Sequence, residues 1–333
     1  MRVRKTSRIT MTALILTTLL AVMGAPQAAA DTQGASRRTD AGPPGNAPVS
    51  LTVMTYNIHW GEGLDGRYDL NRIAQVLKQA HPDLIGLQEV DVCWGPRSQF
   101  EDQVVRLASA LHMRAFFAPI YRLPAHPHAM GPGQTCPVRG SGVAILTRFP
   151  LVATVNHPMA RLSTLEPALF PASYPGFADA VIRVGPTMLR VYNTHLDYRR
   201  NPWVRRMQVA DMLRAMAANS ARYSEILLGD LNAEPDAPEL RPLWSRFVRP
   251  HPDPSLRTFP ADSPERRIDF VLVSAGLRVE RAWTLPSTAS DHRPVVATIR
   301  IDAIPQAERA KGGSTETLQG DRTTAIPDPS KTG

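Results

Sequence analysis

Short apolar runs that end in polar residues recur along this chain. The runs are of strand length and rich in Val, Ile and Leu, and acids, amides or histidines follow them directly. A strand end holds a side chain rigidly where it can meet a ligand. We therefore expect these junctions to share one site. Six junctions show the pattern: Asn57-Ile58-His59, Gln88-Glu89-Val90-Asp91, Asn193-Thr194-His195-Leu196-Asp197, Gly229-Asp230-Leu231-Asn232, Ile268-Asp269 and Ser290-Asp291-His292.

The same pattern predicts alternating strands and helices. A helix capped by Asp69 should begin at Leu70, and a second amphipathic helix should span Phe100–Leu111. A third should bury a stripe at Val204, Met207, Ala210, Leu213 and Ala217, with Arg205, Arg206 and Gln208 off that stripe. Strands are expected at Leu51–Ile58, Leu84–Gln88, Val143–Thr147, Val181–Val184, Leu189–His195, Ile226–Gly229, Ile268–Val273 and Val295–Ile301.

This alternation predicts a layered α/β architecture. Residues 119–140 and 157–178 are rich in Pro, Gly, His and aromatic residues, which predicts two long loops over one end of the sheets. Within the second, Leu169, Phe170, Tyr174 and Phe177 are expected to pack the loop onto the domain, the alternative being contact with a lipid or a base.

The chain divides into four parts by composition. Residues 1–30 combine basic residues with a short apolar stretch and Ala28-Ala29-Ala30, which predicts a cleaved signal peptide and a secreted or extracytoplasmic protein. The alternative is an uncleaved membrane anchor. Residues 31–48 read as a disordered linker and 304–333 as a disordered tail. One domain is expected at 49–303.

Charge and cysteine content narrow the function only slightly. The net charge is +8, but four basic residues lie in the leader, which leaves about +4. That value is too low to indicate nucleic-acid binding by itself. Cys93 and Cys136 are the only cysteines, too few for a sulfur-based zinc site. In an oxidising compartment we expect them to form a disulfide, the alternative being two unpaired thiols.

Asn57 and Glu89 offer an amide oxygen and a carboxylate at the ends of two strands. Such hard oxygen donors suit Mg²⁺, and also Mn²⁺ or Ca²⁺. A single glutamate at a strand end would otherwise be an ordinary surface carboxylate. Asp230 and Asn232 are two residues apart and should face the same side, where a carboxylate can orient water and an amide can hold a phosphate oxygen. Taken alone, Gly229-Asp230-Leu231-Asn232 would be read as a turn.

Two histidines complete the candidate set. His292 follows Asp291, and Asp269 is a possible partner that would fix its tautomer. His195 ends another strand. A lone histidine is more often an ordinary core or surface residue, but here both accompany acids and amides.

The order of these motifs resembles the endonuclease/exonuclease/phosphatase superfamily. The resemblance spans about residues 49–302. It implies a DNase I-like fold, similar to that of neutral sphingomyelinase: a four-layer sandwich of two packed mixed β-sheets flanked by helices. The motifs that carry it are Tyr56-Asn57-Ile58-His59, Leu87-Gln88-Glu89-Val90-Asp91, Gly142–Leu146, Asn193–Asp197, Leu228–Ala233, Arg267–Phe270 and Ser290–Val295.

The resemblance also implies a reaction, the metal-dependent attack of water on a phosphoester. Metal ligands would be Asn57, Glu89 and Asp291. Asp230 and Asn232 would position water and phosphate. His292, oriented by Asp269, would be the general base or a contact to the phosphate in the transition state, and His195 would stabilise phosphate or protonate the leaving oxygen. His59, Asp91 and Asp197 would be supporting neighbours.

The substrate stays open at this stage. Asn57–Leu70 and Arg205-Arg206-Met207-Gln208 resemble a bacterial branch of metal-dependent hydrolases grouped with proteins of GPI-anchor lipid remodelling. We expect a monomeric secreted phosphodiesterase, either a nuclease or an enzyme like phospholipase C or sphingomyelinase that touches the membrane transiently. The alternatives are a phosphomonoesterase and a catalytically silent module that binds phospholipid or nucleic acid. A nuclease would use Arg139, Arg199, Arg200, Arg205 and Arg206 on successive phosphates.

Overall fold

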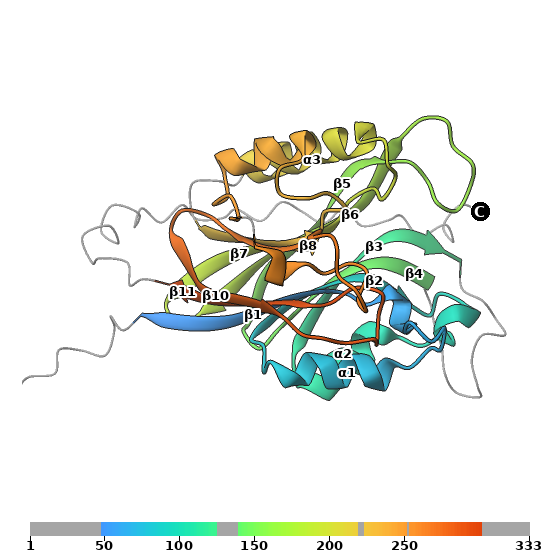
Figure 1. Cartoon of the computed structure of the whole chain (residues 1–333), viewed down its shortest axis with the longest axis horizontal. Coiled ribbons are helices and arrows are strands. Elements are labelled where there is room, and N and C mark those ends of the chain that lie inside the picture. The colour runs from blue at the N-terminus through green and yellow to red at the C-terminus, as the bar shows by residue number, and fades with distance from the viewer. Residues whose placement is uncertain (1–47, 125–138, 219–222, 252, 302–333) are drawn as a thin grey trace, which may run out of the picture. The chain divides into compact units, whose positions relative to one another are not determined.

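Two β-sheets lie face to face between helices in the computed structural model, which describes residues 48–124, 139–218, 223–251 and 253–301 (Figure 1). Within these residues the first sheet has six strands in the order β10 (Leu277–Thr284), β11 (Val295–Ile301), β1 (Val49–Asn57), β2 (Leu84–Val92), β4 (Arg139–Thr147) and β3 (Arg114–Leu123). The second has five, in the order β5 (Leu151–Arg161), β6 (Ala172–Val184), β7 (Thr187–His195), β8 (Ser224–Asp230) and β9 (Asp269–Val273).

Aliphatic side chains from both sheets fill the space between them. Val53 and Ile145 of the first sheet share this core with Val191 and Leu228 of the second. Helices α1 (Leu70–Gln79) and α2 (Gln103–Leu111) cover the outer face of the first sheet (Figure 1). Helix α3 (Trp203–Ala217) and the 3₁₀ helix η3 (Pro238–Ser245) cover the second. The expected four-layer DNase I-like sandwich of mixed sheets is confirmed.

Both sheets mix parallel and antiparallel pairs. β1 runs parallel to β2, and β7 runs parallel to β8, so each of these pairs ends at a common edge of its sheet. The remaining neighbours pair antiparallel, as β8 does with β9. The polar residues that follow β1, β2, β7 and β8 are therefore brought together in two groups, one on each sheet.

Local sequence signals explain where two helices begin. The carboxylate of Asp69 accepts hydrogen bonds from the backbone N–H groups of Asn71 and Arg72, at 2.9 and 3.3 Å, as expected of an N-cap. Helix α2 begins at Gln103 because Asp102 caps it through the N–H of Val105. Phe100, which we placed in this helix, lies before it.

The buried face of α3 differs from the predicted stripe. Met207 is 44% exposed, whereas Arg205 and Gln208 are buried along with Val209 and Met212. Polar partners explain the difference: Arg205 pairs with Glu239, and Gln208 accepts a hydrogen bond from the N–H of Asp197. Polar residues with such partners can occupy core positions, so apolar periodicity alone selected the wrong face.

The two predicted long loops are shorter than expected. Strand β5 extends to Arg161 and β6 starts at Ala172, so most of 157–178 is strand. β3 extends to Leu123, and residues 125–138 of the other predicted loop lie outside the described residues. Phe177 stacks on Tyr192 in the core, as expected, but Leu169 and Phe170 are 86% and 76% exposed. The expectation that this whole aromatic segment packs onto the domain is therefore wrong for Leu169 and Phe170.

The predicted termini and half of the predicted disulfide lie outside the described residues. This applies to segments 1–30 and 304–333, to almost all of 31–48, and to Cys136. Cys93 is buried and disulfide-bonded. Across the described ranges no helix has the length and apolar character needed to cross a membrane.

Gly229 offers a test of the close approach between β7 and β8. Its φ is +155°, and a Cβ built there would lie 2.4 Å from the carbonyl oxygen of Thr194. We expect Gly229→Ala to lower the free energy of unfolding by roughly 2–5 kcal/mol, from overpacking and backbone strain together. Urea denaturation measures this loss. Gly185→Ala is the matched control, because its φ is +56° and nothing lies within 4 Å of the added Cβ. Equal losses in the two variants would contradict the packing argument.

Candidate active site

Three predicted residues lie side by side on neighbouring strands of the second sheet. In the strand register His195 on β7 is opposite Asp230 on β8, and Asp230 is opposite Asp269 on β9. The Nε2 atom of His195 lies 3.5 Å from Oδ2 of Asp230. The register alone thus assembles an imidazole and two carboxylates at one edge of the sheet, and both carboxylates are buried.

Asn57 and Glu89 come from the first sheet: Asn57 ends β1, and Glu89 lies within β2, just past the last residue that pairs with β1. The β2–β4 pairing shifts register between Leu87 and Val90, and Glu89 has a left-handed φ of +54°. A bulge of this kind redirects a side chain, which here leaves the sheet's regular alternation. The Nδ2 atom of Asn57 donates to Oε1 of Glu89 and to Oδ2 of Asp230, both at 3.1 Å. One buried amide therefore links the two sheets.

His292 lies between the two buried aspartates. Its Nδ1 donates to Oδ2 of Asp269 at 2.8 Å, and its Nε2 lies 3.6 Å from Oδ2 of Asp230. Thr258 donates its hydroxyl to the same oxygen of Asp269, and the ring of Phe259 packs against the imidazole with centroids 4.9 Å apart. The hydrogen bond to Asp269 therefore fixes the orientation of the His292 ring.

These contacts fix the charge of His292. Burial alone would lower the pKa of the imidazole, but the carboxylates of Asp269 and Asp230 raise it to about 10. Burial raises the pKa of Asp269, while the hydrogen bonds from His292 and Thr258 oppose that effect. At neutral pH the pair holds its proton on the imidazole. His292 is therefore a donor on both ring nitrogens.

Asn232 and Asp291 support the same cluster from two sides. Asn232 has a left-handed φ of +50°, its N–H donates to Oδ1 of Asp230 at 2.8 Å, and its Nδ2 donates to the carbonyl of Leu196 at 3.0 Å. Asp291 is partly exposed and accepts a hydrogen bond from Ser290, whose hydroxyl also donates to the carbonyl of Asn57 at 2.7 Å. The backbone around Ser290 thus holds Asp291 beside the end of β1.

The neighbours that we ranked lower have structural partners. Asp91 is fully buried and accepts two hydrogen bonds from Arg97 at 2.9 Å. Asp197 pairs with Arg199 and is also held by α3. His59 lies 3.9 Å from Asp291 through Nδ1. Asp91 and Asp197 therefore stabilise the surrounding loops.

A divalent cation fits the donor set in one of two places. Asp230, Asp269 and His292 offer ligand atoms within 4.8 Å of one another, and Oδ1 of Asp269 is buried without a hydrogen-bond partner in the described residues. However, one of these three ligands is an imidazole nitrogen, whereas Mg²⁺ prefers oxygen ligands. The oxygen donors Glu89 and Asp291 beside Asn57 are better suited to Mg²⁺. Asn57 would contribute its oxygen after its amide rotates, because Nδ2 now faces the carboxylates.

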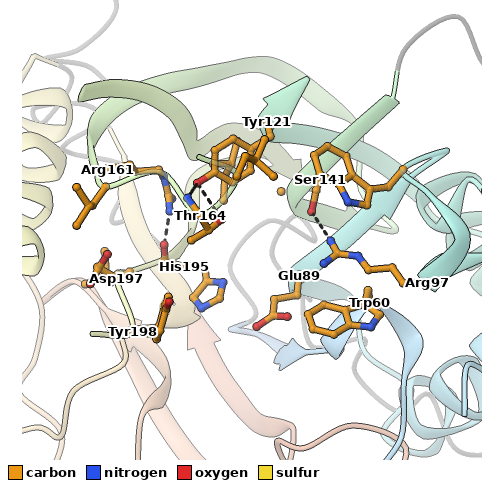
Figure 2. A pocket seen from close by; sticks show the side chains of 16 residues that line it. Trp60, Glu89, Arg97, Tyr121, Ser141, Arg161, Thr164, His195, Asp197 and Tyr198 are labelled. Carbon is orange, nitrogen blue, oxygen red and sulfur yellow. Dashed lines mark hydrogen bonds between the residues drawn. The ribbon is translucent and has the colours of Figure 1, made fainter. Parts of the chain in front are cut away.

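A pocket of about 370 Å³ opens beside Glu89 and His195. Figure 2 shows these two side chains facing each other, with Arg161 on the side of His195 and Trp60 and Arg97 on the side of Glu89. The guanidinium of Arg97 stacks over Trp60 at 4.3 Å. The volume of the pocket lies within the range typical of small-molecule sites. The other prominent lining residues are Trp94, Tyr121, Thr164, Leu165 and Tyr198.

Sequence reasoning missed this pocket. Its lining comes from β3, β5, the segment after β7 and the segment around Trp94, which lie far apart in the chain. Arg161 stands between Ala160 and Leu162, and no motif surrounds it. Only the pairing of β5 with β6 places it there.

Comparison with known proteins gives the same fold and identifies the family. The model of the Endonuclease/Exonuclease/phosphatase family matches residues 54–292. An endonuclease/exonuclease/phosphatase from Beutenbergia cavernae DSM 12333 is 25% identical, with 76% of this chain and 72% of that chain covered and a TM-score of 0.60. No curated protein sequence gives a significant match.

Two more distant structures share the fold. The mannosyl-6-phosphatase Bt3783 of Bacteroides thetaiotaomicron VPI-5482 is 18% identical, covering 75% of this chain and 99% of that chain, with a TM-score of 0.55. The catalytic domain of human Nocturnin, solved with a bound sulfate anion, is also 18% identical, covering 76% and 97%, with a TM-score of 0.54. At this identity each likeness concerns the fold alone.

The chain belongs to the endonuclease/exonuclease/phosphatase family, whose model covers the greater part of its length. It is accordingly a phosphoric ester hydrolase of a family that generally depends on divalent metal ions and acts on phosphoesters such as nucleic acids. The individual roles of the site residues remain predictions.

Asp269→Asn tests the electrostatic coupling with His292. Removing the adjacent carboxylate should lower the pKa of His292 from about 10 towards the ordinary histidine value near 6.5, because burial then opposes the charged form with less compensation. NMR titration of the imidazole carbons in EDTA measures this pKa, with His292→Gln used to assign the signal. Asp65→Asn, which removes an exposed ion pair with Arg72, is the control. An unchanged pKa in Asp269→Asn would show that another group holds the proton.

Proposed function

We propose that this protein is a Mg²⁺-dependent phosphodiesterase in which Asp230 is the central reactive carboxylate. The observation that carries the proposal is the convergence on Oδ2 of Asp230. Asn57 donates to this oxygen at 3.1 Å, and the imidazoles of His195 and His292 lie 3.5 and 3.6 Å away. Two histidines around one carboxylate form a proton-transfer site, and Glu89 supplies an oxygen donor beside it.

The metal ion would be held by Glu89, Asp291 and the amide oxygen of Asn57. When bound, Mg²⁺ neutralises charge on the phosphate and draws electrons from phosphorus. The number of protein donors is low, but Mg²⁺ usually retains several waters and takes the rest of its ligands from substrate. This proposal leaves Asp230 and His195 for proton transfer, with His292 held by Asp269 for contact with the phosphate.

Each of the protein's own residues then has a separate role in the reaction. Asp230 accepts a proton from the attacking water, with Asn232 holding its other oxygen in place. The imidazolium of His292 donates a hydrogen bond to a non-bridging phosphate oxygen, where negative charge grows in the transition state. His195 gives a proton to the ester oxygen as the P–O bond breaks. The raised pKa of His292 favours the phosphate contact over the general-base role.

Several arginines that would serve an extended nucleic-acid interface are already engaged. Arg205 is buried against Glu239, Arg199 pairs with Asp197, and Arg139 donates to the carbonyl of Trp94. Arg200 and Arg206 are exposed. A compact phosphodiester that enters the pocket is therefore favoured over a long duplex that needs many phosphate contacts.

A phosphomonoesterase is the second candidate, and the pocket favours it. A terminal phosphate has two negative charges, and Arg97 and Arg161 line the cavity next to Glu89 and His195. Against this, Arg97 is already neutralised by Asp91. A panel of DNA, RNA, sphingomyelin, inositol phosphates and sugar phosphates, each with Mg²⁺ and with EDTA, separates diester from monoester cleavage.

Glu89→Ala and His292→Ala test the enzymatic proposal. Each should reduce kcat on the best substrate of that panel by roughly 10²–10⁴-fold, because each removes a charge that contacts the reacting groups. Raising Mg²⁺ should partly restore only Glu89→Ala, which loses a metal ligand. Arg214→Gln is the control, since its side chain is 74% exposed on α3. If the wild type turns over no phosphoester in Mg²⁺, or if EDTA has no effect, the proposal fails and the silent binding module becomes the better description.

We also propose a transient contact with membrane surfaces. Leu169 and Phe170 are exposed in the segment that joins β5 to β6, and Leu165 of the same segment lines the pocket. Apolar side chains at the tip of a loop can enter the interface of a bilayer. An exported protein would meet such surfaces, and the disulfide at Cys93 supports export because disulfides persist in oxidising compartments.

The double variant Leu169→Ser/Phe170→Ser tests this contact. It should bind phosphatidylcholine vesicles at least about tenfold more weakly than the wild type, because it loses the several kcal/mol that burying two large apolar side chains contributes. Cosedimentation measures binding, and a soluble chromogenic phosphodiester should be hydrolysed equally by both. Val152→Ser, which alters an exposed valine on β5, is the control. Equal vesicle binding by all three proteins would show that this loop does not contact the membrane.

We also expect the protein to be a monomer, which light scattering measures.

A further inference from the structure

Arg161 is a buried cation that lacks a carboxylate partner. It ends β5, lines the pocket next to His195, and is only 8% exposed. Arg190 and Arg205, which are buried to a similar degree in the described residues, each form an ion pair with a carboxylate, Asp179 and Glu239 respectively. No carboxylate of the described chain lies within 4.0 Å of the Arg161 guanidinium.

The hydrogen bonds of Arg161 use only part of its donor capacity. Its Nη2 donates to the carbonyl of His195 at 3.0 Å and weakly to that of Gly176 at 3.4 Å. Its Nε is buried without a partner, and its Nη1 makes no hydrogen bond to a described residue. A guanidinium has five N–H donors, so most of them are left for another group. Figure 2 shows the side chain beside His195 at the pocket wall.

The protein is built to keep this guanidinium in place. Gly176 has a φ of +119°, and a Cβ there would lie 2.3 Å from Cγ1 of Ile120 and 3.3 Å from Nη2 of Arg161. Burial lowers the pKa of Arg161 to about 10, which still leaves it charged at neutral pH. Asp197 offsets the burial of this charge only in part, without an ion pair, and an anion that enters the pocket offsets more of the cost.

We propose that Arg161 binds a second phosphate of the substrate, next to the phosphate that is cleaved. The inference rests on the proposed function and narrows it. The substrate class is a compact phosphodiester that carries a second phosphate and a ring group. Trp60 and Tyr121 on the pocket wall offer flat surfaces for that ring, and the bidentate fork of arginine matches phosphate geometry. Arg161 is thus a specificity-determining residue, and two sources fit: a phosphorylated nucleotide and a phosphorylated inositol headgroup.

An alternative role for Arg161 is to position His195 through its backbone carbonyl. In that case every substrate would depend on Arg161 equally. A role in binding the second phosphate would instead appear only when that phosphate is present. Matched substrates that differ by a single phosphate separate the two roles.

The experiment measures kcat/KM in Mg²⁺ for two matched pairs. One pair is thymidine 5′-(p-nitrophenyl phosphate) with and without a 3′-phosphate. The other is glycerophosphoinositol with and without a 4-phosphate. The wild type should prefer the phosphorylated member of at least one pair, and which pair shows the preference identifies the source.

Arg161→Gln should remove the preference. We expect kcat/KM to fall roughly 10- to 150-fold on the preferred bisphosphorylated substrate and less than about threefold on its partner, as for loss of a charged hydrogen bond. Arg161→Lys keeps the charge but not the fork and should recover part of the preference. Arg214→Gln should behave as wild type. Equal losses on both members of a pair would overturn the proposal and make Arg161 a positioning residue for His195.

A binding measurement keeps the inference separate from the proposed function. Calorimetry in saturating Mg²⁺ compares methylenediphosphonate with methylphosphonate, which lacks the second phosphonate. Tighter binding of the diphosphonate to wild type, lost in Arg161→Gln, supports the subsite even if no substrate is turned over. If Arg161→Gln does not fold, as judged by its thermal transition, Arg161→Lys takes its place. Equal affinity of the two phosphonates for the wild type would overturn the inference.

Discussion

The buried amide of Asn57 joins the two halves of the site. Asn57 ends a strand of the first sheet, and its Nδ2 reaches Glu89 on the same sheet and Asp230 on the other. Two carboxylates in a buried environment repel one another unless a donor lies between them. The amide supplies that donor without adding charge, and Ser290 fixes its backbone from behind. In the structure this contact holds the metal side beside the proton-transfer side, and a metal ion that binds the oxygen of Asn57 would take its place.

The backbone must also allow the sheets and strands to approach. A Cβ on Gly86 of β2 would lie 2.7 Å from Cβ of Leu228 on β8, and a Cβ on Gly229 would meet the carbonyl of Thr194. Glycines at these two points let the ends of β2, β7 and β8 lie close together. The aliphatic core then sets the distance between the two sheets and thereby the distance between the polar residues at their strand ends.

The sequence predicts the parts of the site that follow from strand register. His195, Asp230 and Asp269 each end or begin a strand, and β7, β8 and β9 are neighbours, so the residues meet without any unusual backbone. Asp69 likewise predicts its helix through a local hydrogen bond. The ordered motifs indicated the family, and with it the two-sheet fold. Local rules and pattern were sufficient because these features depend on few distant contacts.

Other features depend on tertiary partners that no local pattern contains. The bulge at Glu89 requires β4 as the opposing strand, and the buried face of α3 is decided by Glu239, some thirty residues beyond Arg205. Strand β5 contains residues such as His157 and Pro158 that favour a loop reading, yet its pairing with β6 makes it a strand. The pocket is assembled from all of these, so it could not be predicted before the fold.

The charged residues of the site differ between its reacting end and the adjoining pocket. Glu89, Asp230, Asp269 and Asp291 gather at the reacting end, where His292 and a divalent cation balance them. The pocket beside them is lined by Asp197, Arg97 and Arg161, and of these Arg161 is buried without an ion pair to a described carboxylate. A phosphoester with a single charge would satisfy only the first end. Under the proposal for Arg161, the ligand carries its second negative charge beside this guanidinium, which then selects the substrate.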